Sequence, residues 1–129
     1  TRGMPTHIHH GSYRHREGYK GALALLQEGV TALIAGDSMM TAGALEACHN
    51  AGKLIGEEIA LVGFDDFIYL RFQPSPISVV DQDVARMGET ATAKLIAAIN
   101  DKHQPEGEVL ETRYIPRMST AHQLDGATP

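Results

Sequence analysis

The sequence predicts an α/β fold with a mainly parallel sheet, and two observations lead to this prediction. Short runs that are almost wholly apolar, typical of strands covered on both faces, recur along the chain. Between them lie longer segments in which apolar residues return every three or four positions, as on one face of a helix. A chain that alternates strands and helices in this way forms parallel strands joined by right-handed crossovers.

The first part of the chain is expected to hold a strand, a helix and a second strand. Residues 6–11 (THIHHG) alternate loosely in polarity, which suggests a strand. A helix is expected from Arg14 to about Gly29, a residue suited to the C-terminal cap. Residues 31–35 (TALIA) indicate a strand buried on both faces. The apolar face of the helix consists of Tyr19, Leu23 and Leu26.

The alternation continues through the middle of the chain. Asp37 or Ser38 can cap a second helix, and Gly52 ends it. Residues 59–63 (IALVG) are a further candidate for a buried strand, and residues 77–80 (ISVV) form a β-rich run after a proline-containing loop.

The last part of the chain is expected to hold a long helix and an edge strand. The helix covers residues 84–99, a loop follows at 100–108, and residues 109–115 form the strand. Residues 121–129 are expected to be an unstructured tail. Few predicted strands flank the helix, so its full apolar face lacks an obvious partner. That face consists of Val84, Met87, Ala91, Leu95, Ala98 and Ile99.

Composition excludes several classes of protein. Hydrophobic residues make up 43% and charged residues 21% of the 129 residues, which is the balance of one globular domain. Lys and Arg number 11 against 16 Asp and Glu, and the resulting net charge of −5 disfavours direct binding of nucleic-acid phosphates. No apolar run approaches the length of a membrane span. The single cysteine, Cys48, excludes an internal disulfide and favours a reducing compartment such as the cytoplasm.

Polar and aromatic side chains follow the predicted strands. Ligands of open α/β sheets bind beyond the carboxyl ends of the strands, so we select Tyr13, Asp37, Asp65 and Gln82 as candidate ligand-binding residues. A carboxylate accepts strong hydrogen bonds from hydroxyl groups, an amide both donates and accepts, and an aromatic ring packs on the apolar face of a sugar. An anionic ligand would require Arg, Lys or a glycine-rich helix N-terminus, and none stands at these positions. The set therefore predicts a neutral ligand rich in hydroxyl groups.

Each candidate also has a purely structural interpretation. Asp37 can act as a helix cap alone, and Asp65 and Asp66 can be turn residues where a strand stops. Tyr13 can be an ordinary core or surface aromatic residue, and Gln82 taken alone carries little information. Their joint placement at strand ends is what favours binding.

The sequence offers little support for catalysis, a metal or a cofactor. His7, His9 and His10 lie close together, but no Asp, Glu or Cys stands at a spacing that would complete a metal site. The G-x-S-x-G turn of hydrolases, the phosphate-binding P-loop and the G-x-G-x-x-G dinucleotide loop are all absent from the sequence. We therefore expect no enzyme activity, no metal site and no cofactor.

Several motifs together resemble the C-terminal part of lactose/galactose-repressor-type (LacI/GalR) transcriptional regulators over residues 6–120. The combination is specific, although each motif alone is weak. The motifs are TALIAGDSMMTAGA (31–44), AG (51–52), EIALVGFDD (58–66), PIS (76–78), Gln82, MG (87–88) and RMST (117–120).

The resemblance implies a periplasmic-binding-protein-like fold of which this chain holds one part. Residues 1–83 would form the C-terminal effector-binding subdomain without its first βα unit, and residues 84–100 a helix that packs on the N-terminal subdomain. Residues 101–120 would be the returning loop and strand, and residues 121–129 the tail. The chain opens at Thr1, in keeping with a piece of a longer protein.

The resemblance also assigns roles to the candidate residues. Asp65 matches the family's sugar-hydroxyl-binding acid, and Gln82 and Tyr13 match effector-pocket positions. Asp37 follows the position where many members carry a ligand-contacting Asn or Asp. Here that position is Gly36, which has no side chain to offer.

The function implied is that of a cytoplasmic, homodimeric transcriptional regulator with a sugar or similar small polyol as effector. The effector would close the two subdomains and so change the affinity for operator DNA, which a helix-turn-helix outside this chain would contact. A sugar-binding protein of a transport system, with the same fold, is the alternative. The RMST ending favours the regulator, and no membrane partner is expected.

Overall fold

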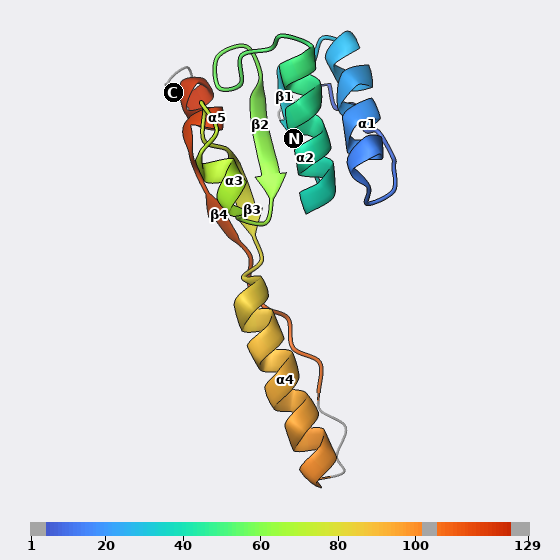
Figure 1. Ribbon diagram of the computed structural model, residues 1–129, viewed down its shortest axis with the longest axis vertical. Helices are drawn as coiled ribbons and strands as arrows, with labels where there is room; N and C mark the ends of the chain where they lie inside the picture. The colour runs from blue at the N-terminus through green and yellow to red at the C-terminus, as the bar shows by residue number, and fades with distance from the viewer. Residues whose placement is uncertain (1–4, 102–105, 125–129) are drawn as a thin grey trace.

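The computed structural model describes residues 5–101 and 106–124, which form an α/β fold around one sheet (Figure 1). Within these residues, four strands lie in the order β1-β2-β3-β4. The first three pair in parallel, and β4 runs antiparallel to β3. The prediction of a mainly parallel sheet is therefore confirmed. The strands are β1 Ala32–Ile34, β2 Ala60–Phe64, β3 Ser78–Asp81 and β4 Arg113–Ile115.

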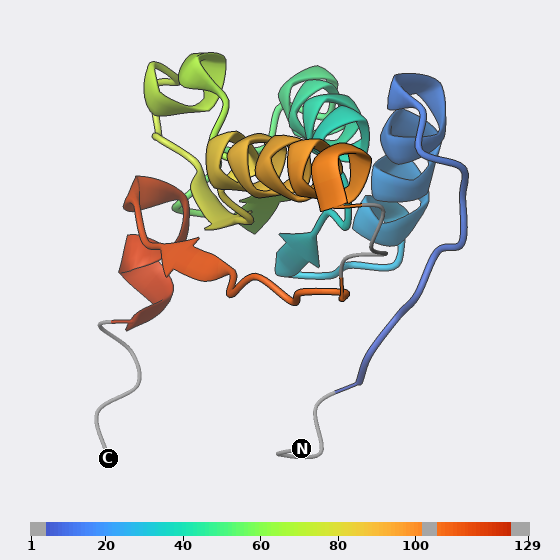
Figure 2. The ribbon, with the colours of Figure 1, turned by 90° about the horizontal axis from the view of Figure 1, so that it is seen from below.

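Helices connect the strands and lie mainly on one side of the sheet. α1, α2 and α3 share that side, whereas α4 extends away from the rest of the molecule (Figure 1, Figure 2). The helices in the described residues are α1 His15–Gln27, α2 Ser38–Asn50, α3 Ile68–Arg71, α4 Val84–Asp101 and α5 Met118–Leu124.

The two long helices beside the sheet begin and end where the sequence indicates. The Asp37 carboxylate caps α2 by accepting hydrogen bonds from the backbone N–H groups of Met39 at 2.8 Å and Met40 at 3.2 Å. Gly29 follows α1 with φ of 80°, and Gly52 follows α2 with φ of 67°. Both glycines adopt the left-handed conformation that ends a helix, which few other residues adopt without strain.

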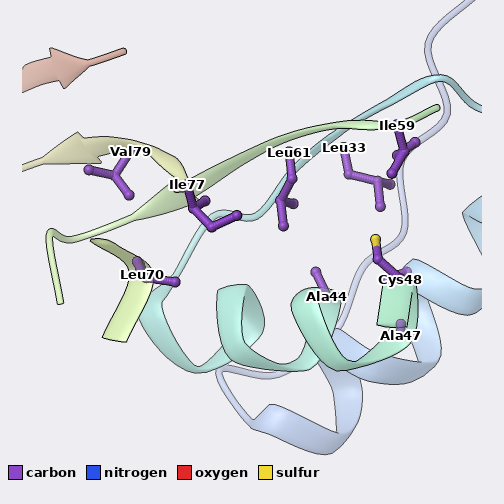
Figure 3. Packing of buried hydrophobic residues seen from close by; sticks show 10 residues of the cluster. Leu33, Ala44, Ala47, Cys48, Ile59, Leu61, Leu70, Ile77 and Val79 are labelled. Carbon is purple, nitrogen blue, oxygen red and sulfur yellow. The ribbon is translucent and has the colours of Figure 1, made fainter. Parts of the chain in front are cut away.

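The hydrophobic core lies between the sheet and α2, and α3 closes one end of it (Figure 3). Side chains of the strands and of the segments that lead into them point toward the two helices, and most are fully buried. The core residues labelled in Figure 3 are Leu33, Ile59, Leu61, Ile77 and Val79 from the sheet side and Ala44, Ala47, Cys48 and Leu70 from the helices.

Cys48 belongs to this core. It is fully buried on α2, and burial raises the pKa of its thiol to about 11. A thiol with so high a pKa stays protonated near neutral pH and is a poor nucleophile or metal ligand. Cys48 packs there as a small buried hydrophobic residue.

Two glycines allow α1 and α2 to pack with their backbones in contact. A Cβ atom at Gly18 of α1 would lie 2.5 Å from the Cα of Met40, and a Cβ at Gly43 of α2 would collide with the backbone of His15 and Tyr19. Backbone atoms cannot move aside as a flexible side chain can. The close packing of the two helices therefore depends on these glycines.

Substitution of Gly43 by alanine is expected to lower the free energy of unfolding by about 1–3 kcal/mol, because the added methyl group forces the helices apart. Gly88 of α4 is the matched control, since a Cβ there meets no atom within 4 Å. Gly88→Ala should be neutral or stabilising by about 1 kcal/mol through helix propensity alone. Urea unfolding of both variants checks the prediction, and equal effects would contradict it.

The structure corrects three of the expectations. Residues 6–11 form no strand, because none of the described strands lies beside them to pair with. The segment 31–35 is not covered on both faces: in β1 the side chain of Leu33 is 6% exposed, but that of Ile34 is 79% exposed. Residues 121–124 belong to α5 rather than to an unstructured tail, and 125–129 lie outside the described residues.

The Arg117-Met-Ser-Thr120 motif precedes and begins α5 and ties it to the sheet. The hydroxyl of Ser119, fully buried, donates to the carbonyl of Leu61 in β2 at 2.6 Å and accepts from the N–H of Ser78 in β3 at 2.8 Å. The Ser78 hydroxyl in turn accepts from the N–H of Arg117 at 2.8 Å. The motif therefore joins two adjacent strands, β2 and β3, through hydrogen bonds.

α4 leaves the body of the molecule with its apolar face uncovered. Val84, Leu95 and Ile99 are 59%, 60% and 69% exposed. The expectation that this face lacks a partner is confirmed for the described residues. Among those residues, no helix has the combination of length and apolar character needed to cross a membrane.

A groove of about 700 Å³ runs between β1 and the extended segment 5–9. Its walls include Ala32 and Ile34 of β1, and Ala22 and Leu25 of α1 lie along it. β1 pairs with β2 through the backbone groups of the residues next to Ala32 and Ile34. The N–H of Ala60 donates to the carbonyl of residue 31, and the N–H of residue 35 donates to the carbonyl of Val62. The other edge of β1 therefore faces the groove.

Candidate functional site

The carboxyl ends of β1, β2 and β3 meet at one edge of the sheet, because the three strands are parallel. This edge brings two of the candidate residues into direct contact. Asp65 follows β2, Gln82 follows β3, and the Nε2 of Gln82 donates a hydrogen bond to Oδ1 of Asp65 at 2.9 Å. The expectation that these two residues lie together at the sheet edge is met.

The backbone of Asp65 has an uncommon conformation. Its φ is 61°, in the left-handed region that glycine favours and that Asp and Asn tolerate better than most residues. Its N–H donates to the carbonyl of Val80 at 2.9 Å, so pairing with β3 continues one residue past the end of β2. The main chain then turns sharply, and the Asp65 carboxylate faces the end of β3.

Asp37 lies at the end of β1 and begins α2, so its carboxylate is engaged as a cap. A second link ties this position to β2: the hydroxyl of Thr41 donates to the Asp37 carbonyl at 2.8 Å and accepts from the N–H of Phe64 at 3.0 Å. The capping interpretation of Asp37 is confirmed. Capping uses one carboxylate oxygen, so Asp37 is still chemically able to meet a ligand.

Tyr13 is the least connected of the four candidates. It precedes α1, and its side chain is 78% exposed. α1 begins at the same end of the molecule as α2, near the tip of β2 (Figure 1). In the described structure, no hydrogen bond or ring contact joins Tyr13 to the other three candidates.

An aromatic pair on the segment after Asp65 is not among the candidates predicted from the sequence. The rings of Phe67 and Tyr69 stack with centroids 6.0 Å apart, and both side chains are partly exposed. Burial raises the pKa of the Tyr69 hydroxyl, and the negative charge of Asp37 raises it further. The pair lies in and just before α3, a four-residue helix too short to give a periodic pattern, and the segment therefore resembles a loop in sequence.

Asp66 has a different role from its neighbour Asp65. Its Oδ1 accepts from Arg117 at 2.7 Å, its Oδ2 pairs with Arg71 at 2.9 Å, and its side chain is only 12% exposed. Burial raises the pKa of Asp66, but the hydrogen bonds and charges of Arg117 and Arg71 outweigh this and hold it below its usual value. Asp66 is thus an ionised, structural residue.

A further basic residue, besides the two that hold Asp66, stands at this edge. β4 runs antiparallel to β3, so its first residue, Arg113, lies opposite Asp81 at the end of β3, with Nη2 3.6 Å from the carboxylate. The candidates selected from the sequence are residues that follow strands, none of which is Arg or Lys, and they therefore do not include Arg113, which begins a strand. Asp81 balances the charge of Arg113, and the edge keeps its acidic character.

The histidines near the N-terminus form isolated pairs. His7 pairs with Glu28, and His15 lies 2.9 Å from Glu46. Within the described residues, no three His, Cys, Asp or Glu side chains gather in a way that could hold a metal ion.

The edge thus presents a carboxylate and an amide in contact, and aromatic rings on the segment that follows Asp65. The Asp65 carboxylate can accept hydrogen bonds from adjacent hydroxyl groups, and the Gln82 carbonyl oxygen remains an acceptor because its NH₂ group makes the bond to Asp65. Such a set suits a neutral, hydroxyl-rich ligand. No nucleophile paired with a base is found among the described site residues.

Comparison with known proteins agrees with this geometry. The family model of the periplasmic binding protein-like domain matches residues 3–120. The chain belongs to this family. Among curated proteins it is similar to the transcriptional regulator MalR of Streptomyces coelicolor (30% identical over 88% of this chain) and to the repressor MelR of Bacillus subtilis (31% over 90%). It covers 33% and 34% of these proteins, so it spans about a third of the length of the relatives it matches.

Solved structures give the same result. A probable LacI family transcriptional regulator from Corynebacterium glutamicum matches with 37% identity and a TM-score of 0.76, over 85% of this chain and 39% of that one. The regulator CelR in complex with cellobiose matches with 28% identity and a TM-score of 0.75, over 84% of this chain and 34% of that one. The resemblance to LacI/GalR-type regulators is confirmed.

Proposed function

We propose that this chain is the sugar-binding part of a LacI-type transcriptional regulator, with a neutral sugar or similar polyol as effector. The observation that carries the proposal is the 2.9 Å contact between Asp65 and Gln82 at the carboxyl edge of the parallel strands. A ligand hydroxyl that donates to Asp65 can lie beside the amide of Gln82. The aromatic pair of Phe67 and Tyr69 offers an apolar surface to the same ligand.

The relatives support a regulator more than a transport protein. MalR and MelR are transcriptional regulators, and the CelR structure holds cellobiose. In our proposal the regulator acts in the cytoplasm as a homodimer. Its effector lies between two subdomains, and closure of the subdomains changes the affinity for operator DNA, with a coupling of about 1–3 kcal/mol. DNA contact would come from a helix-turn-helix outside this chain.

The uncovered surfaces support the proposed division of the chain. The groove beside β1 has the free edge of a strand on one wall and apolar residues of α1 along it, so it suits one further parallel strand. This agrees with residues 1–83 being an effector-binding subdomain whose first βα unit lies elsewhere in the regulator. The exposed apolar face of α4 agrees with residues 84–100 packing on the other subdomain.

Calorimetric titration tests the proposed function. The polypeptide that contains this chain, at its full natural length, is titrated with cellobiose, lactose and ribose, and with glucose 6-phosphate as an anionic comparison. We expect at least one neutral sugar to bind and the phosphate ester to bind more weakly, because the edge is acidic. Failure of every neutral sugar, or preference for the phosphate ester, would contradict the proposal.

A further inference from the structure

We propose that Arg117 is a positioning residue for Asp65: it holds Asp66 against β3 and thereby fixes the Asp65 carboxylate beside Gln82 before any ligand arrives. This inference deepens the proposed function and rests on it for its effect on binding. Arg117 need not touch the ligand, since its guanidinium is engaged by Asp66 and by a backbone carbonyl.

The starting point is the divergence of two adjacent carboxylates. The Asp65 side chain contacts Gln82, whereas the Asp66 side chain contacts Arg117 and Arg71. One peptide bond joins the two residues, so an anchor on Asp66 restricts the rotation of Asp65. The left-handed backbone of Asp65, with φ of 61°, persists only where its surroundings hold it.

Arg117 is itself held against the strand that leads to Gln82. Its Nη1 donates to the carbonyl of Ile77 at 2.8 Å, its Nη2 donates to Asp66 at 2.7 Å, and its N–H donates to the buried hydroxyl of Ser78 at 2.8 Å. Ser78 begins β3. One guanidinium therefore links the turn after β2 to Ile77, the residue that leads into β3. β2 and β3 are the two strands that Asp65 and Gln82 follow.

The planar guanidinium is essential to this arrangement. It offers several N–H donors in a fixed fork, so it can bind the Ile77 carbonyl and the Asp66 carboxylate at once. A lysine ammonium keeps the charge and can meet Asp66 but does not reproduce the fork. The ion pair of Asp66 with Arg71 is weaker than that with Arg117, because water screens it more: the Arg71 side chain is 50% exposed and that of Arg117 is 17% exposed. We expect the positioning to depend mainly on Arg117.

The test compares Arg117→Lys and Asp66→Asn with the unchanged 129-residue chain by ¹⁵N NMR without ligand. The signals to follow are the side-chain NH₂ of Gln82 and the backbone N–H of Asp65, which donates to Val80. We expect the Gln82 signals of both variants to move toward those of a free amide. Exchange of the Asp65 N–H with solvent should accelerate at least tenfold. Arg16→Lys, an exposed position on α1, is the matched control and should change neither signal.

Unchanged Gln82 and Asp65 signals in the folded variants would overturn the proposal. If neither variant folds, Arg71→Gln removes only the more exposed ion pair to Asp66, and a smaller shift of the same signals is then expected. Absence of that shift would count equally against the proposal. These readouts need no sugar, so they separate this inference from the proposed function.

Titration of the full-length polypeptide with cellobiose, lactose and ribose completes the test. Arg117→Lys should weaken the affinity for the sugar that binds by roughly three- to tenfold, because the acceptor must then be ordered on binding. If none of these sugars binds the unchanged protein, the proposed function fails, and NMR alone decides the positioning role. If a sugar binds and Arg117→Lys binds it as tightly, the positioning inference fails and the proposed function stands.

Discussion

Replacement of Asp65 by asparagine is expected to weaken sugar binding by roughly tenfold to one-hundredfold. A hydrogen bond to a charged acceptor contributes about 1.5–3 kcal/mol net, and each 1.4 kcal/mol is tenfold in affinity. Asparagine keeps the shape and can still accept from Gln82, so the change removes the charge while the 2.9 Å contact remains possible. Asparagine also tolerates the left-handed backbone at this position, whereas alanine adds strain of its own. The asparagine variant therefore isolates the role of the carboxylate.

Calorimetric titration with the sugar that binds the unchanged protein measures this effect. Glu57→Gln, an exposed carboxylate on the loop before β2, is the control and should bind as the unchanged protein does. Thermal unfolding of both variants establishes that they are folded at the titration temperature. An Asp65→Asn variant with unaltered affinity would show that the site assignment is incorrect, whatever the family of the protein.

The second large effect concerns α4, whose apolar face should drive self-association of the 129-residue chain. Leu95 and Ile99 lie one turn apart on that face and are 60% and 69% exposed. Burial of apolar area contributes about 25 cal/mol per Å², so a face of this kind in water favours contact with a second copy. The double substitution Leu95→Glu with Ile99→Glu is expected to convert the chain to a monomer. Sedimentation velocity over a concentration series measures the change.

Ala93→Glu provides the matched control for this prediction. Ala93 is exposed on the opposite face of α4, so an added charge there should leave self-association intact. A monodisperse monomer at high concentration for the unchanged chain would contradict the prediction. So would a dissociating effect of Ala93→Glu equal to that of the double substitution.

Much of the fold follows from local patterns in the sequence. α1 has an amphipathic face, a glycine follows both α1 and α2, and Asp37 marks the start of α2, so the positions of the two helices are predictable. The strands β2 and β3 are short apolar runs between loops. α3 was not predictable, because four residues make too little periodicity, and its place depends on the burial of Leu70 in the core.

The candidate site was predictable only in part. Parallel strands place their carboxyl ends together, so Asp65 and Gln82 could be paired without coordinates. The role of Asp66 depended on Arg117, 51 positions along the chain, and the presence of Arg113 at the edge depended on the antiparallel direction of β4. Tyr13 shares an end of the molecule with the other candidates but makes no contact with them.

By itself, the sequence determined the alternation of helix and strand, the acidic and amide residues at strand ends, and the likeness to LacI-type regulators. These features depend on residues close together in the chain, so the spacing of apolar and polar side chains predicts them. Only the tertiary structure decided which carboxylate contacts Gln82 and which is held by arginines, and which apolar faces are left uncovered. Such distinctions depend on contacts between residues distant in the chain, where burial and hydrogen bonding, rather than local propensity, determine the state of each side chain.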